Sequence, residues 1–255
     1  MSGRATVLAV AASLALPAAV AAADNGVRAR AAGAPVVQAM VVGRGGIVIG
    51  RARSVAAPAT VTRVSGRSCA VAAATPLAVL VSLHRAGGPG FSLRDYGRCG
   101  GNAANSGQLY VSSVGGETGT AQNGWEYKVN GVSGSTGAAD PSGPMGDGRR
   151  LRSGARVLWF WCQASAGGCQ RTLEVSVPSR SFAPGAAVPV QVYSYDNEGR
   201  RQAAAGAIVT LGADFASADA SGRATVLAPP ARGRYQVSAA RSGLVPSFPQ
   251  TVAVG

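Results

Sequence analysis

Histidine, lysine and acidic residues are scarce in this chain, and their scarcity argues against several kinds of enzyme. There is one histidine among 255 residues, so a Ser-His-Asp or Cys-His arrangement would have to use His84. That residue falls on the apolar stripe of an expected helix, where a packed or half-exposed histidine is ordinary. No Gly-x-Ser-x-Gly elbow stands on a strand-to-helix turn, and no pair of carboxylates suits glycoside hydrolysis. We therefore expect no enzyme and assign no catalytic residue.

Patterns for metals and cofactors are missing as well. A zinc site needs paired Cys-x-x-Cys spacing, which none of the four cysteines shows. Asp140 and Asp147 flank the loop 141–146 and carry oxygens that calcium accepts. Their spacing matches no EF-hand, however, so turn or capping roles are favoured over calcium binding. We expect neither a metal nor a cofactor.

Long apolar runs are confined to the first residues. Arg4 gives a short positive segment, residues 5–16 are apolar, and the small residues at 19–23 offer cleavage sites. This pattern predicts a secretory signal peptide at residues 1–23, followed by a disordered segment at 24–35. No later stretch is long and apolar enough to span a bilayer, so we expect no transmembrane segment in the mature chain. The expected location is secreted, either extracellular or in the cell envelope.

Positive charge is abundant by contrast, and arginine supplies nearly all of it. The formal net charge is +13, and Lys128 is the single lysine beside 23 arginines. A nucleic-acid partner favours a basic stripe or helix with interleaved aromatics, whereas these arginines are scattered except at Arg149, Arg150, Arg152 and Arg156. We therefore expect no nucleic-acid partner, and an envelope polymer or a small ligand is favoured.

The cysteine count predicts two disulfides. Four cysteines follow an export signal, and in an oxidising compartment an even number is expected to be paired. Three pairings are possible. Cys162 and Cys169 enclose a short loop of small residues that suits a closed hairpin, which leaves Cys69 to pair with Cys99. The expected disulfides are Cys69–Cys99 and Cys162–Cys169.

The chain up to Cys162 predicts a β-sheet with one packed helix. Its 36 glycines and 14 prolines, counted over the whole chain, favour turns and strands over long helices. Alternating or apolar runs predict strands at 36–42, 47–49, 60–64, 109–111, 124–129 and 156–162. Thr75 caps and Pro76 begins the expected helix, which the glycines at 87–90 end. Because the run 156–162 is apolar on both faces, both faces of that strand are expected to be covered.

The rest of the chain predicts a sandwich of short strands. Such strands are expected at 173–177, 188–193, 207–211, 224–227, 235–239 and 251–254. Turn residues separate them at near-regular spacing and no helical pattern intervenes, which is typical of a β-sandwich. The predicted fold class is mainly β, an α+β part followed by an all-β part.

The segment around Trp125 resembles a bacterial secreted family described as transcobalamin-like C-terminal. The signature Gly-Trp-x-Tyr-x-Val-Asn-Gly is similar to residues 124–131, a Gly-Ala/Ser-x-Asp turn to 137–140, and an apolar strand to 157–161. The resemblance covers residues 36 to 162 and implies a β-grasp-like fold, a sheet wrapped across one helix. In the vertebrate cobalamin carriers this domain supplies one face of the corrinoid site and a helical barrel supplies the other. This chain has no such barrel, so corrinoid binding is a less favoured function.

Residues 172–255 resemble bacterial Ig-like or carboxypeptidase-regulatory-like domains. The resemblance is carried by residues 207–211, 219–226 and 233–239. It implies a β-sandwich of the kind found in stalks and spacers. The expected domains are therefore a β-grasp-like domain at 36–170 and an Ig-like sandwich at 171–255.

The favoured site is the loop between the strands that contain Trp125 and Trp159. Tyr127 and Trp161 would supply aromatic faces, and Arg149, Arg150 and Arg152 would hold anionic groups. On this hypothesis the chain is a secreted, non-enzymatic protein whose β-grasp-like module binds a ligand or an envelope component and is presented by the Ig-like domain. The alternative is an extracellular adhesion or spacer protein without a small-molecule site. Exposed aromatics would favour the first hypothesis and buried ones the second.

Overall fold

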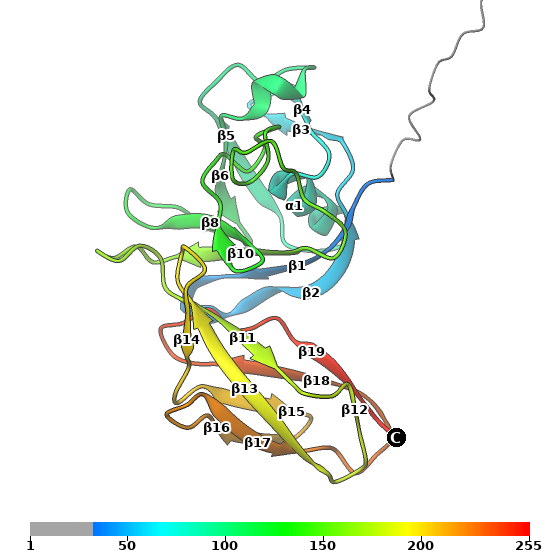
Figure 1. Ribbon diagram of the computed structural model, residues 1–255. Coiled ribbons are helices and arrows are strands. Elements are labelled where there is room, and N and C mark those ends of the chain that lie inside the picture. Colours follow the sequence, from blue (N-terminus) through cyan, green and yellow to red (C-terminus); the bar gives the residue numbers. More distant parts are fainter. Residues whose placement is uncertain (1–32) are drawn as a thin grey trace, which may run out of the picture. The chain divides into compact units, whose positions relative to one another are not determined.

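The computed structural model describes residues 33–255 (Figure 1). Its N-terminal part contains a five-stranded sheet with one helix packed against it. Its strands run in the order β2-β1-β10-β8-β9. They are β1 (Val36–Val42), β2 (Val48–Ala56), β8 (Gly124–Val129), β9 (Val132–Ser133) and β10 (Arg156–Cys162). The pair β1–β10 is parallel and the other pairs are antiparallel. A single 3-10 turn, η1 (Arg44–Gly46), joins β1 to β2.

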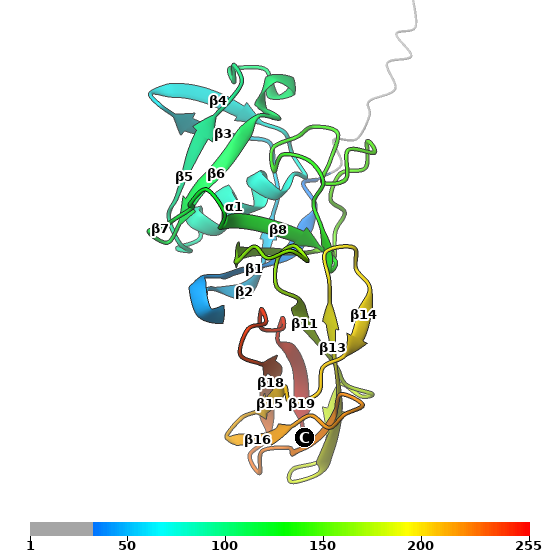
Figure 2. The same cartoon turned by 90° about the vertical axis from the view of Figure 1, so that its left-hand side faces the viewer.

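The helix α1 (Pro76–Arg85) begins where the sequence predicts. The Thr75 hydroxyl accepts a hydrogen bond from the backbone N–H of Ala78 and caps the first turn. The leucines and valines of α1 are buried, and they pack with Trp125 and Trp159 of the sheet in one apolar core. Figures 1 and 2 show α1 lying against the sheet that contains β1 and β8.

Two small sheets complete this part of the chain. One pairs β3 (Thr60–Val64) with β4 (Arg67–Val71). The other pairs β5 (Phe91–Asp95), β6 (Leu109–Val114) and β7 (Glu117–Thr118), with a short 3-10 helix, η2 (Ala103–Ser106), between β5 and β6. Both predicted disulfides, Cys69–Cys99 and Cys162–Cys169, are confirmed.

The remaining strands form two sheets that share a core. The first sheet contains β11 (Thr172–Ser176), β13 (Ala187–Tyr195), β14 (Arg201–Ala203) and β17 (Arg223–Leu227). The second contains β12 (Ser181–Phe182), β15 (Ile208–Leu211), β16 (Asp214–Ser217), β18 (Gly233–Ala240) and β19 (Gln250–Val254). Alternate residues of both sheets, such as Val190 and Val252, pack together and are buried. The predicted fold class, mainly β with one packed α-helix and then a sandwich, is confirmed.

Strand β10 is covered on both faces, as its apolar run predicts. Trp159 faces the core under α1, and Phe160, on the opposite face, is completely buried. The cover over Phe160 comes from distant residues, because Val245 and Phe248 pack against it together with Met40 of β1. The outer face of the first sheet is therefore closed by the loop that precedes β19.

The described residues form one compact unit, so the boundary between residues 170 and 171 stays a prediction. The signal peptide at 1–23 and nearly all of the segment 24–35 lie outside the described residues. Within residues 33–255 no helix is long and apolar enough to cross a membrane.

Candidate functional site

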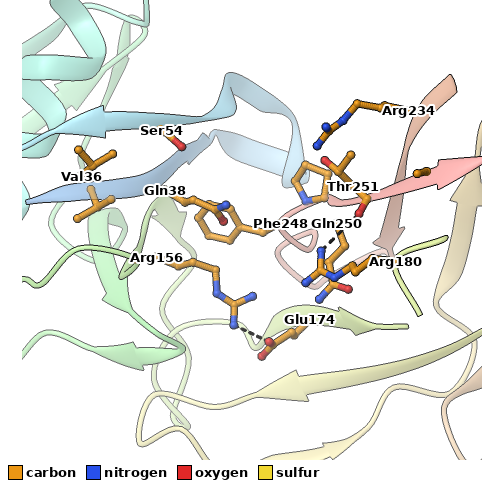
Figure 3. A pocket seen from close by; sticks show the side chains of 14 residues that line it. Val36, Gln38, Ser54, Arg156, Glu174, Arg180, Arg234, Phe248, Gln250 and Thr251 are labelled. Atoms are coloured by element: carbon orange, nitrogen blue, oxygen red, sulfur yellow. Dashed lines mark hydrogen bonds and ion pairs between the residues drawn. The ribbon is translucent and has the colours of Figure 1, made fainter. Parts of the chain in front are cut away.

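A groove of about 860 Å³ lies between the outer face of the first sheet and the β12-β19-β18 part of the sandwich (Figure 3). One wall is formed by β1 and β2, β19 forms the floor, and Arg156 and Glu174 lie on one side. The residues that line it are Val36, Val37, Gln38, Ser54, Gly154, Arg156, Glu174, Arg180, Arg234, Phe248, Pro249, Gln250, Thr251 and Ala253. Three of these are arginines and one is acidic.

The period-two pattern of β19 builds the floor of the groove. Val252 and Val254 point into the sandwich core and are buried. Their neighbours Thr251 and Ala253 point to the opposite face and line the groove. Because both outward residues are small, they leave room above the strand for a ligand.

Arg180 and Arg234 flank this floor from the two sides. The backbone N–H of Ala253 donates to the carbonyl of Arg180 at 2.8 Å. Across the strand, Arg234 of β18 is paired in register with the same residue, Ala253. Strands lie about 4.8 Å apart, so backbones on either side of β19 are about 10 Å apart. Both arginines are exposed, and both line the groove on either side of β19.

Neither of these two arginines has an acidic partner. Among residues 33–255 no carboxylate lies within 4.0 Å of Arg180 or Arg234. The one side-chain hydrogen bond of Arg180 is long, 3.4 Å from Nη1 to the carbonyl oxygen of Thr251. Their donors are therefore available to an anion.

The third arginine is already neutralised. Arg156 Nη2 lies 2.5 Å from Glu174 Oε1, and both side chains are partly buried. The pair lies on one side of the groove in Figure 3, with the Phe248 ring and Gln38 nearby. Phe248 and Val36 add an apolar wall. The groove thus combines a neutral ion pair, an apolar wall and two free cations.

The predicted arginines line a second cavity of about 630 Å³. Arg149, Arg150 and Arg152 are exposed and meet there around buried Leu151. Arg149 Nε lies 3.7 Å from the carboxylate of Asp147, and Arg150 Nε donates to the carbonyl of Pro141 at 2.8 Å. Gly154 lines both cavities, so the predicted arginines and the groove are neighbours.

The two aromatic residues predicted as ligand contacts are buried. Tyr127 is 4% exposed and Trp161 7% exposed, and both belong to the core under α1. The Tyr127 hydroxyl donates to the carbonyl of Thr136 at 2.9 Å, and the Trp161 ring is covered by the Arg44 guanidinium at 4.1 Å. Strand alternation turns both rings inward, so neither offers a free face to a ligand. Both rings belong to the framework of the first sheet, and the role of the loop arginines as ligand contacts stays a prediction.

Sequence reasoning missed the environment of Lys128. The alternation in β8 places it on the face opposite Tyr127, yet it is 1% exposed. Its ammonium donates to the carbonyls of Tyr195 and Asp196, at 3.2 and 2.8 Å. Burial lowers its pKa to about 8, although the Asp196 carboxylate opposes the shift. The one signal in the sequence that Lys128 is unusual was that it is the only lysine.

The other candidates have structural roles. Asp140 accepts hydrogen bonds from the backbone and hydroxyl of Ser142, and Asp147 accepts one from the backbone of Arg149, so both act in turns as expected. His84 is exposed at the end of α1, with its ring edge-on to Phe91. Within residues 33–255 no three His, Cys, Asp or Glu side chains are grouped to hold a metal.

Comparisons with known proteins leave the family open. No family model matches the sequence, and no curated protein matches it. Among solved structures, the chain is similar to one described as the D00-D0 domain of Intimin, at 19% identity with a TM-score of 0.26. That alignment covers 58% of this chain and 90% of the other. We base no argument on this likeness, and the resemblance to the transcobalamin-like family stays a prediction.

Proposed function

We propose that this chain is a secreted, non-enzymatic binding protein that holds an anionic polymer of the cell envelope in the groove between β1 and β19. The observation that carries the proposal is the pair Arg180 and Arg234, which face the groove without an acidic partner. The export signal, the two disulfides and the net charge of +13 are consistent with such a setting.

The spacing of the charges favours a polymer over a single ion. The backbones of Arg180 and Arg234 are about 10 Å apart on either side of β19, and this spacing suits two charges along one chain. The second cavity, with Arg149, Arg150 and Arg152, continues the basic surface beyond Gly154. A chain with regularly spaced phosphates would contact both groups of arginines. Guanidinium groups bind phosphate through paired N–H donors, so we favour a phosphate-rich polymer.

Titration calorimetry on the full chain tests this proposal, with polyglycerol phosphate, polygalacturonate and neutral dextran as probes. We expect binding of polyglycerol phosphate and none of dextran. The double variant R180Q/R234Q should weaken the affinity at least about tenfold, which is 1.4 kcal/mol. The control R232Q/R241Q removes the same charge at exposed arginines that do not line the groove, and should keep nearly the native affinity. Equal losses in both variants would contradict a specific groove.

The second candidate is an adhesion or spacer protein without a small-molecule site. It is favoured by the burial of Tyr127 and Trp161, which leaves no aromatic platform in the predicted site. In that case the first sheet and the sandwich form a rigid support, because Val245 and Phe248 pack onto β1 and β10. Native protein that binds neither anionic probe would favour this candidate. Both proposals include the division of the chain into domains at 36–170 and 171–255.

A further inference from the structure

Exposed aromatic side chains are few in this protein, and two of them lie together. Among residues 33–255 the exposed aromatic rings are Tyr96, Tyr110 and Phe215, with 66%, 39% and 70% of their surface accessible. The rings of Tyr96 and Tyr110 are 6.2 Å apart and tilted by 55°. Phe215 stands alone on the sandwich. The other aromatic rings are buried or partly buried, so the tyrosine pair is an unusual feature of this surface.

The small sheet of β5 and β6 places the two rings on its outer face. Leu109 and Val111 of β6 point into the core and are buried, so Tyr110 between them points outward. Tyr110 is paired in register with Arg94 of β5. Just beyond the end of β5, the backbone N–H of Tyr96 donates to the carbonyl of Gln108 at 3.2 Å. Arg94, Tyr96 and Tyr110 thus share one face.

Polar groups surround the pair on both sides of Tyr110. A cavity of about 350 Å³ holds both tyrosines together with Arg94, Ser112, Thr118 and Thr120. A second cavity of about 440 Å³ has Tyr110 as a shared wall and adds Gln122, Asn123 and Glu126. The side-chain oxygen of Asn123 accepts a hydrogen bond from Ala164, which leaves its amide N–H groups free to donate.

Glu126 contributes an unpaired carboxylate to this surface. No cation among residues 33–255 lies within 4.0 Å of it. Its side chain reaches solvent, yet the surrounding protein removes water from the carboxyl group and raises its pKa. Tyr110 and Glu126 line the same cavity, and burial together with the negative charge of Glu126 raises the pKa of Tyr110. A free acceptor, free amide donors and two aromatic faces therefore meet at one place.

We propose that the surface formed by Tyr96, Tyr110 and Glu126 is a binding site for a neutral oligosaccharide. The C–H groups on one face of a pyranose ring carry partial positive charge and stack on the negative face of an aromatic ring. The sugar hydroxyls need donors and acceptors at the edge of the pyranose ring, which Glu126 and the side-chain amides of Gln122 and Asn123 supply. The two rings, with one cavity on each side of Tyr110, fit two or more sugar units. An apolar partner would leave the Glu126 carboxylate without a hydrogen bond.

Gly124 leaves the space that the Tyr110 side chain occupies. A Cβ atom on Gly124 would lie 2.8 Å from the Tyr110 hydroxyl oxygen, closer than side chains tolerate. Gly124 has no positive φ, so alanine fits its backbone and acts only by displacing Tyr110. The variant G124A therefore moves one ring of the pair without removing it.

The test is titration calorimetry of the full chain with two probes, chitohexaose and cellohexaose. We expect native protein to bind at least one of them, Y96A/Y110A to lose at least about tenfold in affinity, and G124A to weaken binding in the same direction. F215A, which removes a lone exposed ring, should bind as native does. R180Q/R234Q should also bind as native does, so that failure of the polymer groove and failure of this site are distinguishable. No binding of either probe by native protein, unchanged binding in Y96A/Y110A, or an equal loss in F215A would overturn the proposal.

Discussion

The ammonium of Lys128 lies 2.8 Å from the backbone carbonyl oxygen of Asp196 and joins the first sheet to the sandwich. A second bond to Tyr195 and a contact with the Phe160 ring at 5.9 Å hold it in place. These acceptors are neutral carbonyls, so they compensate only part of the lost hydration of the charge. The only lysine of the chain is therefore a buried cation at the meeting point of its two main parts.

This burial predicts a stability that rises with pH. The pKa of Lys128 is about 8 in the folded state against 10.5 in the unfolded chain, so the unfolded state binds more protons between these values. Unfolding free energy should increase by on the order of 2 kcal/mol from pH 8 to pH 10. The pKa values of Tyr110, Tyr127 and Tyr195 are raised in the folded state, so these groups oppose the lysine effect as the pH approaches 10. Urea unfolding at several pH values measures the slope.

The variant K128M tests whether Lys128 is the cause of this pH dependence. Methionine does not titrate, so the rise in stability between pH 8 and pH 10 should disappear even if overall stability changes. Selective 13C-lysine labelling gives a single Cε resonance, whose titration in the native protein should have a midpoint near 8. A midpoint near 10.5, or a slope that persists in K128M, would show that the ammonium is hydrated.

Close packing against Tyr127 predicts that Gly134→Ala is destabilising. An added Cβ would lie 2.0 Å from the Tyr127 ring, which the hydrogen bond to Thr136 and the core hold in place. Overpacking of this kind costs about 1–3 kcal/mol. Gly101→Ala is the control, because nothing lies within 4 Å of its Cβ position and its φ is not positive. Thermal unfolding should separate the two variants; equal melting temperatures would contradict the packing.

The two disulfides should contribute unequally. Cys69 and Cys99 are 30 residues apart and Cys162 and Cys169 only 7. Constraining the unfolded chain over these loops is worth about 3.6 and about 2.4 kcal/mol. The variant C69A/C99A should therefore unfold at a lower temperature than C162A/C169A. The reverse order in calorimetric scans would refute the loop-length argument.

Local patterns predicted the strands and the helix well. Thr75 and Pro76 mark the start of α1 through interactions within one turn, so no tertiary information is needed. The apolar run containing Trp159 and Phe160 required cover on both faces, and the structure has it. Asn130 and Gly131 adopt the positive φ angles, 49° and 88°, that their turn demands.

Features that depend on distant pairing could not be predicted. Lys128 follows a half-buried alternation, and its burial comes from residues 195 and 196 and Thr172. Arg180 and Arg234 lie far apart in the sequence, and only the strand order β12-β19-β18 brings them to the same groove. Tyr96 and Tyr110 likewise meet through the pairing of β5 with β6. A single sequence gives no strand order, so the groove and the tyrosine pair were both missed.

Salt dependence gives a further prediction for the groove. A polyanion that is neutralised by arginines displaces counterions, so its affinity should fall linearly with salt on a logarithmic scale. Removing two contacts in R180Q/R234Q should reduce that slope by about two. R232Q/R241Q should leave the slope unchanged. A lower affinity with an unaltered slope in R180Q/R234Q would indicate a structural effect.

The most direct measurement of the central claim is an NMR map of the arginine side chains. The Nε–H resonances of native protein would be recorded as polyglycerol phosphate is added. Our account predicts that Arg180 and Arg234 shift first and saturate together, while Arg232 and Arg241 do not move. Uniform small shifts across all arginines, or none at Arg180 and Arg234, would contradict the groove as the binding site.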